Sequence, residues 1–197
     1  MRHFDVIYNL QIQGGEPLLN NDLSEIIQYI LQYRNRIRNI WIISNGTIMP
    51  SVELLETLRD TKVTFAVSNY DLNKAHAMRI SERCNQFNVP YRRRRATTWY
   101  HFSITEVHAN KSTLKGDLIK KYNACPMRDC PSLKGNKLYL CSRLANIVDV
   151  RSGIFDDGII LNDSADNISG LFLHKCYSDN CKYCDFDFLK RCKPGVQ

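Results

Sequence analysis

The chain has 197 residues, of which 44 % are hydrophobic and 24 % charged, and its formal net charge is +7. This composition excludes a chain that is disordered throughout and suits one domain, or one domain with a small appendage. No apolar run approaches the roughly 20 residues of a membrane span, and the opening MRHFDVIYNL lacks an apolar signal segment. We therefore expect a cytoplasmic protein without membrane contact.

A short strand is predicted at residues 7–12, where apolar residues alternate with polar ones. It runs into GGEP, residues 14–17, whose glycines permit positive φ or a close backbone approach and whose Glu16 puts a carboxylate at the turn. Asp22, with Glu25 three residues later, predicts a capping box that opens a helix. In α/β proteins this junction, at the carboxyl end of a strand, is where ligands bind.

The alternation of strands and helices continues along the first half of the chain. Strands are predicted at IRNIWIIS, at KVTFAVSNY and from Tyr91 onward. Helical spacing occurs at residues 51–59 and 73–88, and Pro90 closes the second helix. This βαβαβαβ order predicts an α/β fold with a parallel sheet, either open or curled toward a barrel.

The pattern changes after residue 96. Residues 103–124 are polar and are expected to be irregular, and seven of the eight cysteines follow them. We place a domain boundary near residue 110, so that residues 1–110 form the α/β part and residues 111–197 a cysteine-rich module. Such a module is too small to fold on its apolar core alone, and a metal would hold it together.

The cysteines of the second part are spaced Cys-x4-Cys-x10-Cys and then Cys-x4-Cys-x2-Cys-x7-Cys. In a reducing compartment such clustering indicates a metal centre. Cys181 and Cys184 would place two thiolates on one tight turn, and the glycine turn and apolar strand of LKGNKLYLC would carry Cys141 back toward Cys125 or Cys130. The spacing leaves the metal open, because zinc and iron–sulfur clusters both accept four thiolates.

Further candidate ligands lie close by in the sequence. They are His174, which we interpret as a surface histidine, together with Cys176 and Cys192. One metal centre needs four ligands and two centres need eight. The seven cysteines are too few for two centres, so we expect one. Cys84 shares a helical face with Ile80 and is expected to be a buried structural residue.

A basic run, RRRR at residues 92–95, precedes Trp99 and Tyr100. Arginines interleaved with aromatic residues are typical of proteins that grip a nucleic-acid strand. The same run is also compatible with a solvated basic edge, or with a site for a small anionic substrate. The mixed charge of the rest of the chain favours the second interpretation.

The segments GGEPLL, IISNGT and FAVSNYD end the first three predicted strands, and the tail reads CPMRDCPSLKGNKLYLCSR … CKYCDF. Together they resemble the radical S-adenosylmethionine superfamily, in members with a C-terminal SPASM or twitch extension. GGEPLL is similar to the glycine-rich motif that ends the second barrel strand of that family. The tail resembles the extension that binds an auxiliary [4Fe–4S] cluster.

The resemblance implies a partial radical-SAM (βα) barrel, from its second strand onward, followed by a SPASM- or twitch-like extension. The complete enzyme would generate a 5′-deoxyadenosyl radical that abstracts hydrogen from an unidentified small-molecule, sugar or peptide substrate. Cys125, Cys141, Cys181 and Cys184 would hold the auxiliary cluster, with Cys130 as the rival of Cys125. The residues implied to contact S-adenosylmethionine are Gly14, Gly15, Glu16, Pro17, Ser44, Asn45, Ser68 and Asn69.

The chain departs from the family in one large respect. The family has a Cys-x3-Cys-x2-Cys motif before the GGEP segment, and this sequence does not contain it. We therefore expect a protein truncated at its N-terminus, inactive alone, that binds S-adenosylmethionine weakly or not at all. The missing strand would leave an exposed edge beside residues 6–12, to be covered by a second copy or by a separate N-terminal piece. The alternative function is a zinc-stapled basic module that binds nucleic acid.

Overall fold

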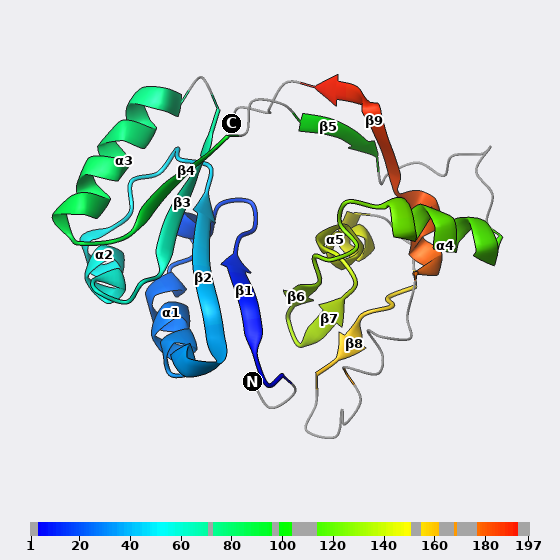
Figure 1. The fold of residues 1–197 in the computed structure, drawn as a ribbon, viewed down its shortest axis with the longest axis horizontal. Coiled ribbons are helices and arrows are strands. Elements are labelled where there is room, and N and C mark those ends of the chain that lie inside the picture. Colours follow the sequence, from blue (N-terminus) through cyan, green and yellow to red (C-terminus); the bar gives the residue numbers. More distant parts are fainter. Residues whose placement is uncertain are drawn as a thin grey trace. The chain divides into compact units, whose positions relative to one another are not determined.

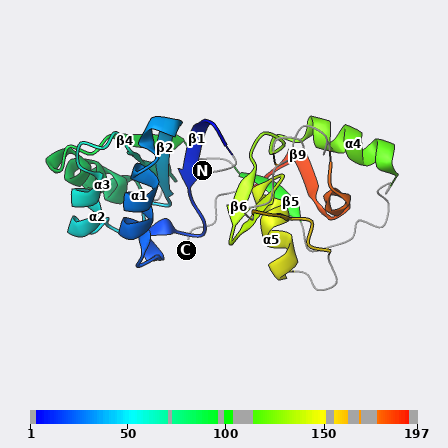
Figure 2. The ribbon, with the colours of Figure 1, turned by 90° about the horizontal axis from the view of Figure 1, so that it is seen from below.

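The chain divides into two compact units, one running to Trp99 and the other spanning Tyr100–Cys192 (Figure 1, Figure 2). The domain boundary expected near residue 110 lies outside the described residues. The structure is a computed structural model that describes residues 4–70, 73–95, 99–103, 114–150, 155–161, 168 and 177–192.

The first unit contains a four-stranded parallel sheet with the strand order β1-β2-β3-β4. Hairpins cannot join parallel neighbours, so each crossover carries a helix. The α/β class and the parallel sheet predicted from the sequence are confirmed. The elements are β1 (Ile7–Ile12), the 3₁₀ turn η1 (Pro17–Leu19), α1 (Leu23–Leu31), the 3₁₀ turn η2 (Arg34–Arg36), β2 (Ile37–Ser44), α2 (Val52–Leu58), β3 (Thr64–Asn69), α3 (Lys74–Gln86) and β4 (Tyr91–Arg95).

The core of this unit lies between the sheet and its three helices, which cover one face of the sheet (Figure 1). Ile27 of α1, Leu55 of α2 and Phe65 of β3 are fully buried in it. Each such side chain contributes roughly 1.5–3 kcal/mol by leaving water. Cys84 of α3 is also fully buried in this cluster, as predicted.

Helix α1 begins where the sequence predicts, but without the predicted capping box. Asp22 occupies the N-cap with φ −88° and ψ 8°, and its side chain makes no capping hydrogen bond. Instead, its own backbone N–H donates to Oδ1 of Asn20 at 2.9 Å. The prediction of a capping box is therefore wrong. A cap residue reaches the N–H groups of the first helical turn from an extended backbone, and Asp22 does not adopt that conformation.

The second unit combines short strands with helices. A helix covers residues 115–124, where the sequence suggested irregular structure, and Leu118 is its one buried residue. A helix with so little buried surface leaves almost no apolar periodicity to detect. The elements are β5 (Trp99–Ser103), α4 (Lys115–Ala124), β6 (Ser132–Lys134), β7 (Lys137–Tyr139), α5 (Ser142–Val150), β8 (Ile159–Ile160), the 3₁₀ turn η4 (Asp179–Tyr183) and β9 (Asp185–Cys192).

Strands β6, β7 and β8 form one antiparallel sheet, and β5 pairs with β9. The hairpin between β6 and β7 turns at Gly135, whose φ of +58° suits glycine. This is the turn predicted from LKGNKLYLC, and β7 carries the chain to Cys141. Among the described residues, no helix is both long and apolar enough to cross a membrane.

Candidate metal centre

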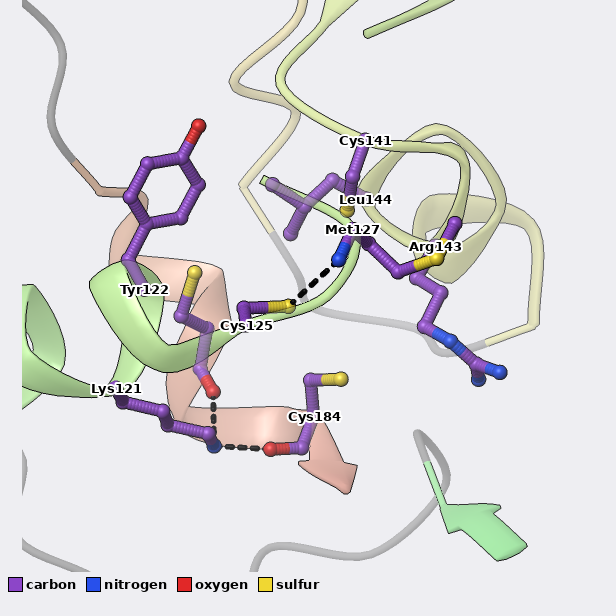
Figure 3. A pocket seen from close by; sticks show the side chains of 9 residues that line it. Lys121, Tyr122, Cys125, Met127, Cys141, Arg143, Leu144 and Cys184 are labelled. Carbon is purple, nitrogen blue, oxygen red and sulfur yellow. Dashed lines mark hydrogen bonds between the residues drawn. The ribbon is translucent and has the colours of Figure 1, made fainter. Parts of the chain in front are cut away.

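Four cysteines line one pocket of the second unit: Cys125, Cys141, Cys181 and Cys184. Figure 3 shows the side chains of Cys125, Cys141 and Cys184 pointing into it. Its remaining wall consists of Lys121, Tyr122, Met127, Arg143 and Leu144.

These four are the cysteines that the resemblance assigns to an auxiliary cluster. Cys130, the rival of Cys125, does not line the pocket, and its backbone N–H donates to the carbonyl of Met127 at 3.1 Å. His174 and Cys176 lie outside the described residues, as does the side chain of Cys192. The described cysteine side chains are all free thiols: Cys84, Cys125, Cys130, Cys141, Cys181 and Cys184.

Backbone N–H groups point at three of the four sulfur atoms, and that of Cys181 accepts the N–H of Ser178. Cys125 caps the C-terminus of α4, and the N–H of Met127 donates to its Sγ at 3.4 Å. Cys141 immediately precedes α5, and the N–H groups of Arg143 and Leu144 donate to its sulfur. Such donors, and the positive end of a helix, stabilise thiolates and metal-bound sulfur.

Lys121 holds the Cys-x2-Cys turn from one side. Cys181 lies within η4 and Cys184 follows it as the C-cap. From α4, the Lys121 ammonium donates to the carbonyl oxygen of Cys181 at 2.5 Å and to that of Cys184 (Figure 3). One cation thus ties both ends of the turn to α4.

Two buried polar side chains hold the same turn from the other side. The Ser178 hydroxyl donates to the Asp157 carboxylate and accepts the backbone N–H of Asn180 at 3.0 Å. The Asn180 side-chain amide donates to the carbonyl of Phe155 at 2.8 Å. The turn that carries two of the four thiols is therefore ordered by the protein's own contacts.

Burial governs the charge state of these thiols. It raises the pKa of Cys181 to about 11 and also raises the pKa values of Cys141 and Cys184. The nearby Arg143 and Lys121 oppose this effect at Cys184 by favouring its thiolate. Without metal these thiols are neutral at neutral pH, so a metal that binds them must displace protons.

Among the described residues, no group of three or more His, Cys, Asp and Glu side chains is arranged so that it could hold a metal ion. The four thiols thus share a pocket without converging on one ion-sized point. A group bound by all four would have to span the pocket.

The residues implied to contact S-adenosylmethionine lie at the carboxyl ends of β1, β2 and β3. The Glu16 carboxylate, 9 % exposed, accepts the backbone N–H of Leu18 at 3.2 Å and that of Asn45 at 2.7 Å. Ser44 is fully buried, and its Oγ accepts the N–H of Gly46 at 3.0 Å. Glu16 therefore links the end of β1 to the loop that follows β2.

Asn73, which the sequence analysis missed, completes this corner of the sheet. Its side-chain N–H groups donate to the carbonyl of Asn45 at 2.7 Å and to that of Ser68 at 2.9 Å. Its Oδ1 is buried and has no hydrogen-bond partner among the residues that the structure describes. The sequence signal that could have identified Asn73 is its place at the start of the helix predicted at residues 73–88, where it is the N-cap residue. The side chain of Asn69 lies outside the described part of the chain.

Gly14 and Gly15 are open on the side where a side chain would project. A Cβ added at either would meet nothing within 4 Å, and neither has positive φ. The fold thus uses neither the positive φ nor the close internal approach that the sequence allowed for. Pro17, the next residue but one after Gly15, is buried at the start of η1.

No family model, curated protein or solved structure matches this chain. The structure establishes an α/β unit with a parallel sheet and a second unit with a four-cysteine pocket. The resemblance to radical S-adenosylmethionine enzymes rests on the sequence motifs.

Proposed function

We propose that Cys125, Cys141, Cys181 and Cys184 bind a [4Fe–4S] cluster, and that the chain is a radical S-adenosylmethionine family protein in which this cluster is auxiliary. The observation that carries the proposal is the shared pocket. Its thiols come from positions up to 59 residues apart in the sequence, beside Lys121 and Arg143. Two cations offset the negative charge that four thiolates bring to a metal centre.

The resemblance of the tail to an auxiliary-cluster extension favours a cluster over zinc. Zinc needs four sulfur atoms about 2.3 Å from a single point. A [4Fe–4S] cluster gives each thiolate its own iron and is held by cysteines spread around it. The N–H groups that donate to the sulfur atoms of Cys125 and Cys141 suit the sulfur ligands of such a cluster.

The chain's own residues would position and shield this group. Leu144, Met127 and Tyr122 supply apolar wall, while Lys121 holds the Cys181–Cys184 turn in place. When bound, such a cluster supplies electron transfer or a contact for substrate. The substrate of the complete enzyme would be a small molecule, a sugar or a peptide.

We further propose that S-adenosylmethionine binds at the sheet corner of Gly14, Glu16, Asn45 and Ser68. The open backbone at Gly14 and the unpaired Oδ1 of Asn73 support a ligand there. The Asn73 amide cannot be flipped to remove that unpaired atom, because its N–H groups face two carbonyls. The chain contains no Cys-x3-Cys-x2-Cys triplet, so thiolates for the cluster that cleaves S-adenosylmethionine must come from elsewhere.

The same proposal implies a binding partner at the edge of the sheet and a cytoplasmic location. Among the described strands β1 pairs only with β2, which leaves one edge for a second copy or for a separate N-terminal piece. Free thiols throughout the described residues are in keeping with a reducing cytoplasm.

The test is anaerobic reconstitution with ferrous iron and sulfide, followed by absorption spectroscopy and counts of iron, sulfide and zinc. We expect about four irons and four sulfides per chain, with a sulfide-to-iron charge-transfer band. Serine at position 125, 141, 181 or 184 should remove most of the iron. The matched controls Cys130→Ser and Cys84→Ser should keep it.

Two outcomes would contradict the proposal. A colourless protein with one tightly held zinc would favour the zinc-stapled module, whose basic run would then be tested against nucleic acid. Equal loss of iron in Cys130→Ser and Cys125→Ser would show that the pocket does not define the ligands.

A further inference from the structure

Strand β4 presents its arginines to both faces of the sheet in a fixed order. The Tyr91 hydroxyl donates to the carbonyl of Ala77 in α3 at 3.0 Å, so Tyr91 faces the helices. Successive side chains of a strand point to opposite faces. Arg93 therefore lies on the helix-covered face, and Arg92 and Arg94 lie together on the opposite face.

These arginines have no partner within the described part of the chain. Arg92, Arg93 and Arg94 are all exposed, and none makes an ion pair or side-chain hydrogen bond there. Like charges two residues apart on a strand lie about 7 Å from each other and repel. Three neighbouring cations without a carboxylate leave their donors available to an external anion.

The neighbouring strand places small residues beside Arg92 and Arg94, of which Ala66 is fully buried and Ser68 is partly exposed. In the parallel register Arg92 pairs with Ala66, and Arg94 pairs with Ser68. Both β3 residues are small and lie on the same face as their arginine partners. Arg94 and Ser68 also lie toward the carboxyl ends of their strands, where open parallel sheets bind ligands.

We propose that Arg92 and Arg94, with the Ser68 hydroxyl, bind the phosphate or diphosphate group of a small molecule. A guanidinium presents two parallel N–H donors that match a pair of phosphate oxygens, and two guanidiniums at this spacing reach one such group. Anion binding here is independent of the metal centre. The assignment of this anion to the substrate rests on the proposed function.

A small molecule fits this pair better than a nucleic-acid strand does. Tight binding of a polyanion depends on many phosphate contacts, about six to ten in typical complexes. Arg92 and Arg94 are two cations on one face, and Arg93 points to the other. The described strand thus offers one compact site and no track of successive phosphates.

The test is calorimetric titration of the full chain with inorganic pyrophosphate at about 100 mM salt. The double variant R92Q/R94Q should bind pyrophosphate at least about tenfold more weakly than the parent. The control R93Q removes the same kind of charge from the same strand on the other face, and its affinity should fall less than about threefold. Circular dichroism checks that each variant is folded, and iron content should be unchanged in all of them.

Equal weakening in R93Q and in R92Q/R94Q would overturn the site, since it would show a diffuse charge effect. So would the lack of saturable pyrophosphate binding by the parent. Tight binding of single-stranded thymidine oligonucleotide that pyrophosphate cannot displace would overturn the small-molecule assignment. A parent that binds pyrophosphate but holds no iron would leave this site standing while the proposed function fails.

Discussion

Three glycines differ in what the fold requires of them. Gly46 has a φ of +75°, and a Cβ added there would lie 2.6 Å from Cγ1 of Val67. Gly14 and Gly15 would accept a Cβ without contact and without positive φ. The fold itself explains glycine at position 46, whereas the described structure does not require glycine at positions 14 and 15.

This difference gives a prediction for stability. Gly14→Ala and Gly15→Ala should leave the free energy of unfolding unchanged or raise it by up to about 1 kcal/mol, because alanine restricts the unfolded chain. Gly46→Ala should lower it by about 1–3 kcal/mol through backbone strain and overlap with Val67. Urea unfolding followed by circular dichroism measures all three. A loss at Gly14→Ala as large as that at Gly46→Ala would mean that the fold needs glycine there.

Single residues also show where sequence reasoning stops. A carboxylate at the end of β1 was predicted from GGEP, and Glu16 is found there. Its partner, the N–H of Asn45, lies 29 residues away in the chain. No local pattern encodes that pairing, because it depends on β1 and β2 lying side by side.

At the scale of elements, α4 contributes Lys121 and Tyr122 to the candidate site, although its segment was predicted to be irregular. It carries Lys121 and ends at Cys125, yet its only buried residue is Leu118. Its role depends on polar contacts with η4 rather than on an apolar face. Strands β2 and β3 were predictable because burial imposes an apolar pattern on them.

The hydrogen bonds from Lys121 to the carbonyls of Cys181 and Cys184 lead to a second prediction. Lys121→Met removes the cation that holds the carbonyls of Cys181 and Cys184, so a bound cluster should lose iron to a chelator about tenfold faster. Loss of a nearby positive charge should also make the cluster's reduction potential more negative. Iron release kinetics and electrochemical titration measure the two effects.

Lys120→Met is the matched control for this prediction. The Lys120 side chain is 84 % exposed and lies 3.9 Å from Asp117, away from the thiols. Its replacement should leave both the release rate and the potential unchanged. Equal effects of the two variants would show that iron release and potential depend on net charge and not on the hydrogen bonds from Lys121.

At the scale of the whole molecule, the two units differ in what holds them together. The first has a continuous apolar core, and its parallel sheet and its helices were predicted from hydrophobic patterns and from the alternation of strands and helices. The described core of the second is smaller, centred on Tyr139, Leu140 and Leu144 beside Cys141. The sequence supplied the cysteines of this unit, but not the cations and buried polar side chains that order them, because those act across long separations.

Metal removal should therefore affect the two units unequally. After chelation of iron, we expect faster amide hydrogen exchange in α4, η4 and α5, since bound metal stabilises the segments that carry its ligands. Exchange in β2 and β3 should stay slow. Hydrogen exchange read by mass spectrometry distinguishes the segments, and equal loss of protection in both units would show that the metal stabilises the chain as a whole.

The hydrogen bonds from Lys121 also bear on how strongly a cluster is held. They join residues 60 positions apart, and closing a flexible loop of that length costs about 4 kcal/mol of chain entropy. Because folding has already closed this loop, cluster binding does not incur that cost again. The affinity of the pocket should then reflect the iron–thiolate bonds and the release of protons, with little conformational penalty.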